Sequence, residues 1–168
     1  INTNRFISKK LFNFHFSLLP KYRGCHTNFY QILYGEKITG VTLHLMNKGI
    51  DTGNIIDKIT YNLPINCTAF ENYKKLLKYS FKLFKKNINR INKKKYTSKK
   101  QLIKNGSYFS RKSINYTKII KINKLNHNLK THNKIRSLIF QPFQLPIYNG
   151  NKIVRSIYKN RKIKLIYQ

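Results

Sequence analysis

The chain has 168 residues, of which 40% are hydrophobic and 14% aromatic, and this composition is sufficient for one packed domain with a small addition. Thirty-five Lys and Arg stand against four Asp and Glu, so the formal net charge is +31. No stretch reaches the ~18 uninterrupted apolar residues of a membrane span, and neither Cys25 nor Cys67 has the Cys or His spacing of a zinc site. The sequence therefore predicts a cytoplasmic protein in a reducing setting, without a membrane segment or a metal.

The excess of positive charge would ordinarily favour a nucleic-acid partner, because clustered Lys and Arg displace counterions from phosphate backbones. Here the basic residues are spread through the chain and are mixed with Asn, Ile, Tyr and Phe. We interpret this mixture as a general drift in composition, with nucleic-acid binding as the alternative. In both cases the positive field attracts anionic ligands.

The first part of the chain is expected to alternate strands and loops with one short helix. Strands are expected at 11–16, 41–46 and 55–62, a loop at 17–24 and a helix at 27–34. Pro20 and Gly24 favour the loop, because both residues interrupt regular structure. Thr27 can cap the helix, and Gly35 ends it. From Val41 onward apolar and polar residues alternate, which is typical of a strand with two different faces.

The clearest helix is expected to begin at the capping box of Thr68 and Glu71, in which each side chain bonds the backbone N–H of the other residue. Apolar residues then recur at helical spacing on one face, which we expect to pack on the sheet: Phe70, Tyr73, Leu77, Phe81, Phe84 and Ile88. The stretch 89–105 is rich in Lys and Asn and lacks this periodicity, so it is expected to be a linker.

The remainder of the chain predicts a small C-terminal part. A helix is expected near 125–138, and Asn149-Gly150 between two alternating runs indicates a type I′ hairpin. The sequence thus predicts an α/β core at 1–105 and a small subdomain with a helix and a β-hairpin at 106–168. The hairpin either packs on its own chain or joins two copies in a homodimer.

Three polar side chains carry the chemistry that the sequence suggests. Asn13 and His15 alternate at the end of the first strand, and Asp51 lies in the Gly-bracketed loop GIDTG. An amide and an imidazolium that converge on one point can donate hydrogen bonds to an oxyanion, while a carboxylate holds charge and relays a proton. This set suits acyl transfer without a covalent nucleophile. Taken singly, each residue has a structural interpretation, as a polar strand end or a turn residue; their joint occurrence favours the functional one.

Three spaced motifs resemble the signature of a known family. NFHFSLLPKYRG at 13–24, GVTLHLM at 40–46 and GIDTGNI at 49–55 are similar to the folate-dependent formyltransferases. The resemblance implies formyl transfer from 10-formyltetrahydrofolate to an amine, on a Rossmann-like α/β open sheet. This chain would hold the C-terminal part of that sheet, followed by a small β-rich subdomain. It also implies that part of the domain precedes Ile1, so that 1–105 is an N-terminally truncated catalytic core.

By this resemblance Asn13, His15 and Asp51 match the catalytic Asn, His and Asp of the family. The folate-contacting loop of the family corresponds to Ser17, Leu18, Leu19 and Pro20. Phe16 stands where many members have proline or a small residue, which would narrow the site.

The later segments favour one branch of the family. YFSRKSINY at 108–116 and RSLIFQPFQLPIYNGNKI at 136–153 resemble the C-terminal part of sugar N-formyltransferases, so the expected acceptor is the amine of a nucleotide-linked amino sugar. Methionyl-tRNA formyltransferases are the first alternative, although they usually follow the Arg-Gly pair with Ala-Ala-Pro-Ile, where this chain reads CHTNFYQIL. The second alternative is an inactive relative that binds RNA or an acidic partner through its basic surface.

Overall fold

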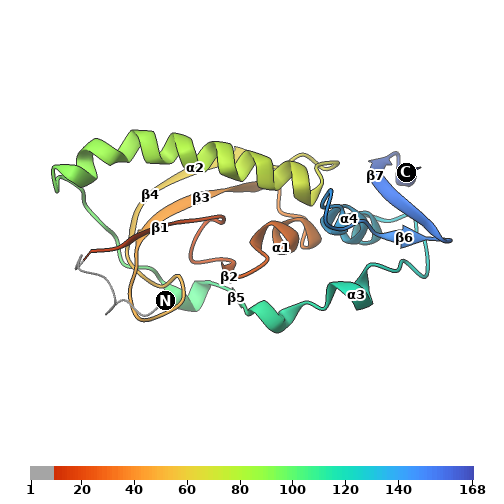
Figure 1. Cartoon of the computed structure of the whole chain (residues 1–168), viewed down its shortest axis with the longest axis horizontal. Helices are drawn as coiled ribbons and strands as arrows, with labels where there is room; N and C mark the ends of the chain where they lie inside the picture. Colours follow the sequence, from red (N-terminus) through yellow and green to blue (C-terminus); the bar gives the residue numbers. More distant parts are fainter. Residues whose placement is uncertain (1–9) are drawn as a thin grey trace. The chain divides into compact units, whose positions relative to one another are not determined.

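The structure is a computed structural model that describes residues 10–168 (Figure 1). Its strands are β1 Phe12–His15, β2 Arg23–Gly24, β3 Ile38–Leu45, β4 Ile55–Asn62, β5 Tyr108–Phe109, β6 Ile147–Tyr148, β7 Asn151–Lys159 and β8 Lys162–Tyr167. Its α-helices are α1 Thr27–Leu33, α2 Ala69–Asn92, α3 Tyr116–Ile119 and α4 Leu129–Leu138. Contacts divide the described chain into two compact units: unit 1 at 10–27, 38–61 and 75–110, and unit 2 at 28–37, 62–74 and 111–168.

Unit 1 is built on a sheet with the order β1-β3-β4. β1 runs antiparallel to β3, with Asn13 opposite His44 and His15 opposite Thr42. Side chains alternate across a strand, and the phenylalanines at positions 12, 14 and 16 pack against the core that β3 shares with α2. Fully buried residues form that core, namely Val41, Leu43, Leu76 and Leu83. Asn13 and His15 consequently face the other side of the sheet.

β3 shows the alternation that the sequence predicts, but both of its faces are buried. Val41 and Leu43 face the core under α2, and Thr42 and His44 lie on the opposite face. The loop after β1 covers that second face, because Thr42 Oγ1 donates to the Ser17 carbonyl at 2.6 Å and accepts from Leu19 N–H at 3.1 Å. The loop is thereby fixed against the middle of the sheet.

The capping box at the start of α2 is confirmed: Thr68 N–H donates to Glu71 Oε2 at 2.9 Å, and Glu71 N–H donates to Thr68 Oγ1 at 3.2 Å. The expected buried face is wrong by one residue, because Leu76 and Leu83 are fully buried whereas Leu77 and Phe81 are 45% and 57% exposed. Two neighbouring stripes along this helix both contain apolar residues at helical spacing. The stripe with the larger side chains lies at the edge of the contact between α2 and the sheet.

α2 also runs to Asn92, four residues beyond the last position of the predicted apolar face, so the expected linker at 89–105 begins inside a helix. Ile91 explains the extension, since it packs with the core of unit 1 while its Lys and Asn neighbours stay exposed. Ile55 and Lys99 exchange two backbone hydrogen bonds, in which the N–H of each donates to the carbonyl of the other at 2.8 Å. Further along the chain, β5 pairs in parallel with β2. Residues 93–105 are mostly exposed, but Lys99 and Gln101 bind the loop and strand of unit 1, so this segment belongs to unit 1 and does not link the two units.

Unit 2 contains α1, α3, α4 and the antiparallel sheet β6-β7-β8. The predicted hairpin is present: Asn149 and Gly150 have φ of 48° and 79°, the left-handed values that a type I′ turn requires. α4 begins later than expected, at Leu129, where Asn128 caps it by accepting from Thr131 N–H at 2.8 Å. Each of the two compact units is made of separate stretches of the chain, so they do not test a single boundary between domains. The predicted boundary between residues 105 and 106 stays a prediction.

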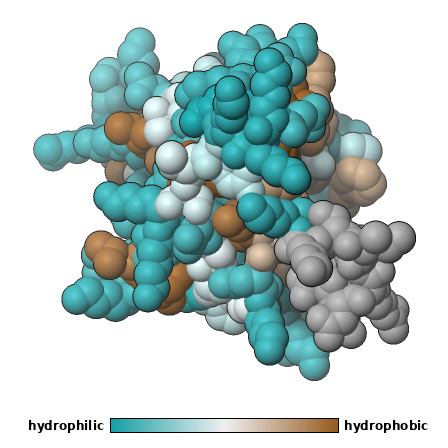
Figure 2. All heavy atoms as spheres, turned by 90° about the vertical axis from the view of Figure 1, so that its left-hand side faces the viewer, coloured by the Kyte–Doolittle hydropathy of each residue, from teal (hydrophilic) through white to brown (hydrophobic). Residues whose placement is uncertain are grey.

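The surface of the described chain carries many basic side chains. On the face in Figure 2, hydrophilic side chains are spread widely, with hydrophobic ones between them. Three lysines of α2 lie over aromatic rings, with Nζ at 4.8 Å (Lys74, Phe70), 5.1 Å (Lys82, Tyr79) and 4.6 Å (Lys85, Phe81) from the ring centre. Among the described helices, none combines the length and the apolar character needed to cross a membrane.

Candidate active site

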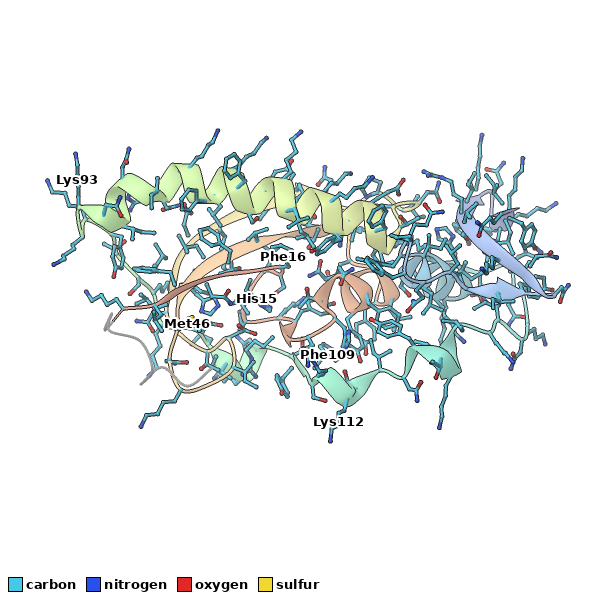
Figure 3. All side chains as sticks on the ribbon, viewed as in Figure 1. His15, Phe16, Met46, Lys93, Phe109 and Lys112 are labelled. Carbon is cyan, nitrogen blue, oxygen red and sulfur yellow. The ribbon has the colours of Figure 1, made fainter. Side chains whose placement is uncertain are left out.

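The polar residues of the first and third sequence motifs meet on the face of the sheet opposite α2. Asn13 and His15 come from β1, and Asp51 comes from the turn between β3 and β4. Figure 3 shows His15 on the side of β1 that faces away from α2. Asn13 Nδ2 donates to Asp51 Oδ1 at 3.3 Å, and His15 Nδ1 lies 3.5 Å from Asp51 Oδ2. The structure therefore brings the three side chains together, and their catalytic roles stay a prediction.

Asp51 is held in an uncommon backbone conformation. Its φ of 52° lies in the left-handed region, which Asp tolerates better than most residues but which still costs free energy. Its Oδ2 atom accepts a hydrogen bond from Gly24 N–H at 2.8 Å. Burial alone would raise the pKa of Asp51, but the hydrogen bond with His44, the charge of His15 and the Gly24 N–H together lower the pKa to about 2. Asp51 is therefore ionised at neutral pH.

His15 is buried at the end of β1, and its two ring nitrogens have different partners. Nε2 lies 2.7 Å from the Tyr22 carbonyl oxygen, which can only accept, so Nε2 carries the hydrogen and Nδ1 faces Asp51. Burial lowers the pKa of His15, and His44 adds to this, whereas the Asp51 carboxylate and the Tyr22 carbonyl oppose it. The imidazole is consequently neutral near pH 7. The sequence predicts an imidazolium that binds an oxyanion, and this role stays a prediction, since a neutral His15 becomes an imidazolium when it takes a proton on Nδ1.

His44 also belongs to the site, although the sequence interpretation treated it only as part of a strand. Its Nδ1 donates to the Leu45 carbonyl at 2.8 Å, and its Nε2 lies 3.3 Å from Asn13 Nδ2 and 3.5 Å from Asp51 Oδ1. A polar residue inside the apolar GVTLHLM motif is the signal that could have found it, since a buried imidazole requires partners. Within residues 10–168, no group of three or more His, Cys, Asp or Glu side chains is arranged to bind a metal.

Gln101 is a second residue that sequence reasoning missed. Its Nε2 atom donates to the backbone carbonyls of Asp51, at 3.0 Å, and Gly53, at 2.6 Å. The side chain is buried, although it lies in a stretch rich in lysine. No local pattern marks this Gln, because its partners are about fifty residues away in the chain.

The predicted folate-contacting loop has two kinds of residues. Ser17 and Leu19 are fully buried, and Ser17 Oγ donates to the Lys21 carbonyl at 2.7 Å. Leu18 and Pro20 are half-buried. The Leu19 carbonyl accepts from Lys58 Nζ, and burial lowers the pKa of that lysine. The contact of this loop with folate stays a prediction, and in this structure only Leu18 and Pro20 have side-chain surface for it.

Comparison with known families places these residues in context. The family model described as formyl transferase matches residues 4–88, about half of the chain, and this range contains Asn13, His15, His44 and Asp51. The chain therefore belongs to the formyl transferase family.

Solved structures of this family are similar to the chain over most of its length. WlaRD, a sugar 3N-formyl transferase determined in the presence of dTDP and 5-N-formyl-THF, is 48% identical with a TM-score of 0.82, over 89% of this chain and 54% of that one. The N-formyltransferase from Helicobacter canadensis, determined with folinic acid and dTDP-3-aminofucose, is 45% identical with a TM-score of 0.86, over 95% of this chain and 59% of that one. These likenesses confirm the predicted α/β formyltransferase fold with a β-rich C-terminal part.

Curated relatives point to more than one branch of the family. The methionyl-tRNA formyltransferase of Clostridium tetani is 33% identical over 82% of this chain and 44% of its own length. The bifunctional polymyxin resistance protein ArnA of Wigglesworthia glossinidia brevipalpis is 44% identical over 50% of this chain and 13% of its own length. The chain thus spans less than half of these curated relatives and little more than half of the two solved ones.

Proposed function

We propose that the protein transfers a formyl group from 10-formyltetrahydrofolate to the amine of a nucleotide-linked amino sugar. The observation that carries this proposal is the cluster of Asn13, His15 and Asp51, in a chain that belongs to the formyl transferase family. Support for the acceptor comes from the two solved relatives at 48% and 45% identity, one a sugar 3N-formyl transferase and the other bound to dTDP-3-aminofucose.

Each side chain of the cluster has a role that its geometry supports. Formyl transfer requires that the attacking amine lose a proton and that the charge developing on the formyl oxygen meet a hydrogen-bond donor. The neutral His15 takes the proton on Nδ1, and the ionised Asp51, 3.5 Å away, stabilises the resulting imidazolium. Asn13 can donate to the formyl oxygen by giving up one of its two 3.3 Å hydrogen bonds, to Asp51 or to His44. The proton held on His15 then passes to the nitrogen that loses the formyl group when its bond to the formyl carbon breaks.

The residues of this chain fit a folate co-substrate. Bound 10-formyltetrahydrofolate supplies the formyl carbon. Leu18 and Pro20 follow His15 closely in the chain and keep half-buried apolar surface that suits a flat ring. Asn13 and Asp51 would hold the formyl group and the amine beside it. Ser17 and Leu19 would act indirectly, by fixing the loop to β3 through Thr42.

The proposal is tested by offering three acceptors in parallel. Purified protein is mixed with 10-formyltetrahydrofolate and either a dTDP-linked amino sugar, glycinamide ribonucleotide or methionyl-tRNA, and tetrahydrofolate release is followed. We expect release with the amino sugar alone. An absence of release with all three acceptors would contradict the proposal.

Methionyl-tRNA is the second candidate acceptor, and a specific observation favours it. Three methionyl-tRNA formyltransferases are 30% to 33% identical over 82% to 94% of this chain. Release of tetrahydrofolate with methionyl-tRNA and not with the amino sugar would select this candidate and keep the same chemistry at Asn13, His15 and Asp51.

We also propose that the protein works in the cytoplasm. Support comes from the two cysteines, Cys25 and Cys67, which are both free. A disulfide in the protein isolated from its native cells would contradict this location. Assembly into a homodimer stays a prediction, which the molecular mass in solution would decide.

A further inference from the structure

The turn that carries Asp51 is fixed by a residue far from it in the sequence. Gln101 is 4% exposed and lies in unit 1 between α2 and β5. Its amide nitrogen has two hydrogens, and the two carbonyls that accept them belong to Asp51 and Gly53, on both sides of Thr52. One amide thus spans the part of the turn in which the backbone must reverse.

This turn needs an external constraint because its own conformation is unfavourable. Asp51 has a φ of 52°, and a residue other than Gly in this region persists only when its surroundings determine it. Gly53 is packed so tightly that an added Cβ would lie 1.7 Å from the Leu45 carbonyl oxygen. The carbonyls of Asp51 and Gly53 both accept from Gln101, so removal of its amide takes this donor from both sides of Thr52 at once.

The direction of the Asp51 side chain follows from the backbone that Gln101 holds. The carboxylate receives Asn13 Nδ2 on Oδ1 and Gly24 N–H on Oδ2, with His15 Nδ1 at 3.5 Å. A change in φ at Asp51 would rotate the carboxylate away from all three groups at once. These three groups do not fix the backbone of the turn by themselves, because they all act on the side chain.

We propose that Gln101 is a positioning residue, whose amide holds the turn so that the Asp51 carboxylate faces His15 and Asn13. This inference rests on the proposed function, because it assigns the residue that aligns the same site. Gln101 acts through Asp51 and does not itself touch the reacting groups. This role requires an amide on a side chain of this length. Asn is one methylene too short to reach both carbonyls, and the carboxylate of Glu would place an acceptor against two acceptors.

The inference can be tested on the 168-residue chain without an activity assay, by titrating His15 by NMR. The groups that face His15 are the Asp51 carboxylate, the His44 imidazole and the Tyr22 carbonyl. The Asp51 charge raises the pKa of His15, so Asp51→Asn should lower it further. Gln101→Met keeps the length of the side chain and removes the donor, and we expect it to shift the His15 titration in the same downward direction.

A purely structural role of Gln101 would give the opposite shift. Burial is the main cause that lowers the pKa of His15, so loosening of the fold would raise that pKa toward its ordinary value of 6.5. Asn87→Leu is the matched control: this buried amide donates to Asp57 and the Leu83 carbonyl and, like Gln101, has an amide oxygen without a partner. We expect it to lower stability and to leave the titration of His15 unchanged.

Each result decides between the inference and the proposed function. An unchanged or raised pKa of His15 in Gln101→Met, with a lowered pKa in Asp51→Asn, would overturn the inference and leave the proposed function standing. An unchanged pKa in Asp51→Asn would contradict both, because His15 and Asp51 would then not interact. If Gln101→Met does not fold, Gln101→Asn should give a smaller downward shift. Failure of both variants to fold would show a role in folding and overturn the inference.

Discussion

At the scale of single residues, Asp51 has the largest number of roles in the site. It accepts from Asn13 and Gly24, faces two imidazoles and has a pKa of about 2. Asn in its place keeps the shape but loses the charge that stabilises an imidazolium at His15. We expect Asp51→Asn to lower the rate of formyl transfer at least about a hundredfold, because loss of one preorganised group costs on the order of 3 kcal/mol.

Asp57 provides the matched control for this substitution. It is also a carboxylate of unit 1, but it pairs with Lys86 at 2.9 Å and Asn87 at 2.9 Å, outside the site. Asp57→Asn should leave the rate of formyl transfer unchanged within about a factor of two, since exposed ion pairs contribute little. Equal rates for the two variants would remove Asp51 from the mechanism.

The buried imidazoles make stability depend on pH in a defined direction. Burial lowers the pKa of His15 and of His132 below 6.5, so below that value the unfolded chain binds more protons than the folded one. Stability contributed by the neutral imidazoles is therefore complete above about pH 7 and falls as the pH drops toward 5. Asp51 affects stability at lower pH, because the stability that its ionised carboxylate contributes is lost as the pH falls from 3.8 toward about 2.

Urea unfolding measured between about pH 7 and pH 5 checks this direction. The free energy of unfolding should decrease over this range in the unsubstituted protein, and His15→Asn should decrease less because one buried imidazole is gone. Identical slopes for the two proteins would mean that His15 does not titrate with a lowered pKa.

The sequence supplied the main members of the site for a physical reason. Asn13, His15 and Asp51 lie in short motifs whose polarity contrasts with their apolar surroundings, and an acid is conspicuous in a chain with four of them. Gln101 has no such contrast, and the contrast of His44 with its apolar motif does not by itself show which residues it meets. Their roles depend on the β1–β3 register and on the return of the chain at residue 101, which are tertiary features.

At the scale of elements, the pairing of β2 with β5 depends on the absence of a side chain at Gly24. Its φ is 89°, and an added Cβ would lie 2.2 Å from the Phe109 carbonyl oxygen. Gly150 in the hairpin turn also has a positive φ, of 79°, but no atom lies within 4 Å of its added Cβ. We expect Gly150→Ala to cost about 1–2 kcal/mol for the backbone conformation alone.

Gly24→Ala should cost more than Gly150→Ala, because a backbone clash adds to a similar conformational cost. The free energy of unfolding in urea measures both variants under one condition. A smaller loss at Gly24 would mean that β2 and β5 can separate without affecting the core of unit 1.

Element prediction succeeded where one local signal was decisive. The capping box at Thr68 and the Asn149-Gly150 turn determine their elements through adjacent residues, and both are present as expected. The buried stripe of α2 and the segment after Asn92 were predicted wrongly. In both cases packing partners elsewhere in the chain decide between alternatives that the local sequence leaves equal.

At the scale of the whole molecule, the charge of +31 leaves two interpretations, drift in composition and nucleic-acid binding. Drift predicts no aromatic platform beside the basic residues. Three aromatic rings of α2 have a lysine over them, and the most exposed of the three is Phe81, which is 57% exposed with Lys85 over its ring. Aromatic side chains beside lysines can stack bases, so this pair is where the alternative interpretation has its strongest support.

We nevertheless expect that the basic residues reflect drift in composition. Stacking of RNA bases depends on particular aromatic residues, whereas drift in composition leaves only the attraction of RNA by the overall charge. Purified protein should bind unrelated RNA weakly, the affinity should fall steeply between low and physiological salt, and Phe81→Ala should leave it unchanged. Lys159→Gln on β7, far from Phe81 in the sequence, should weaken binding as much as Lys85→Gln, because each removes one charge. Strong binding that Phe81→Ala abolishes would establish α2 as a nucleic-acid surface and overturn the interpretation as drift.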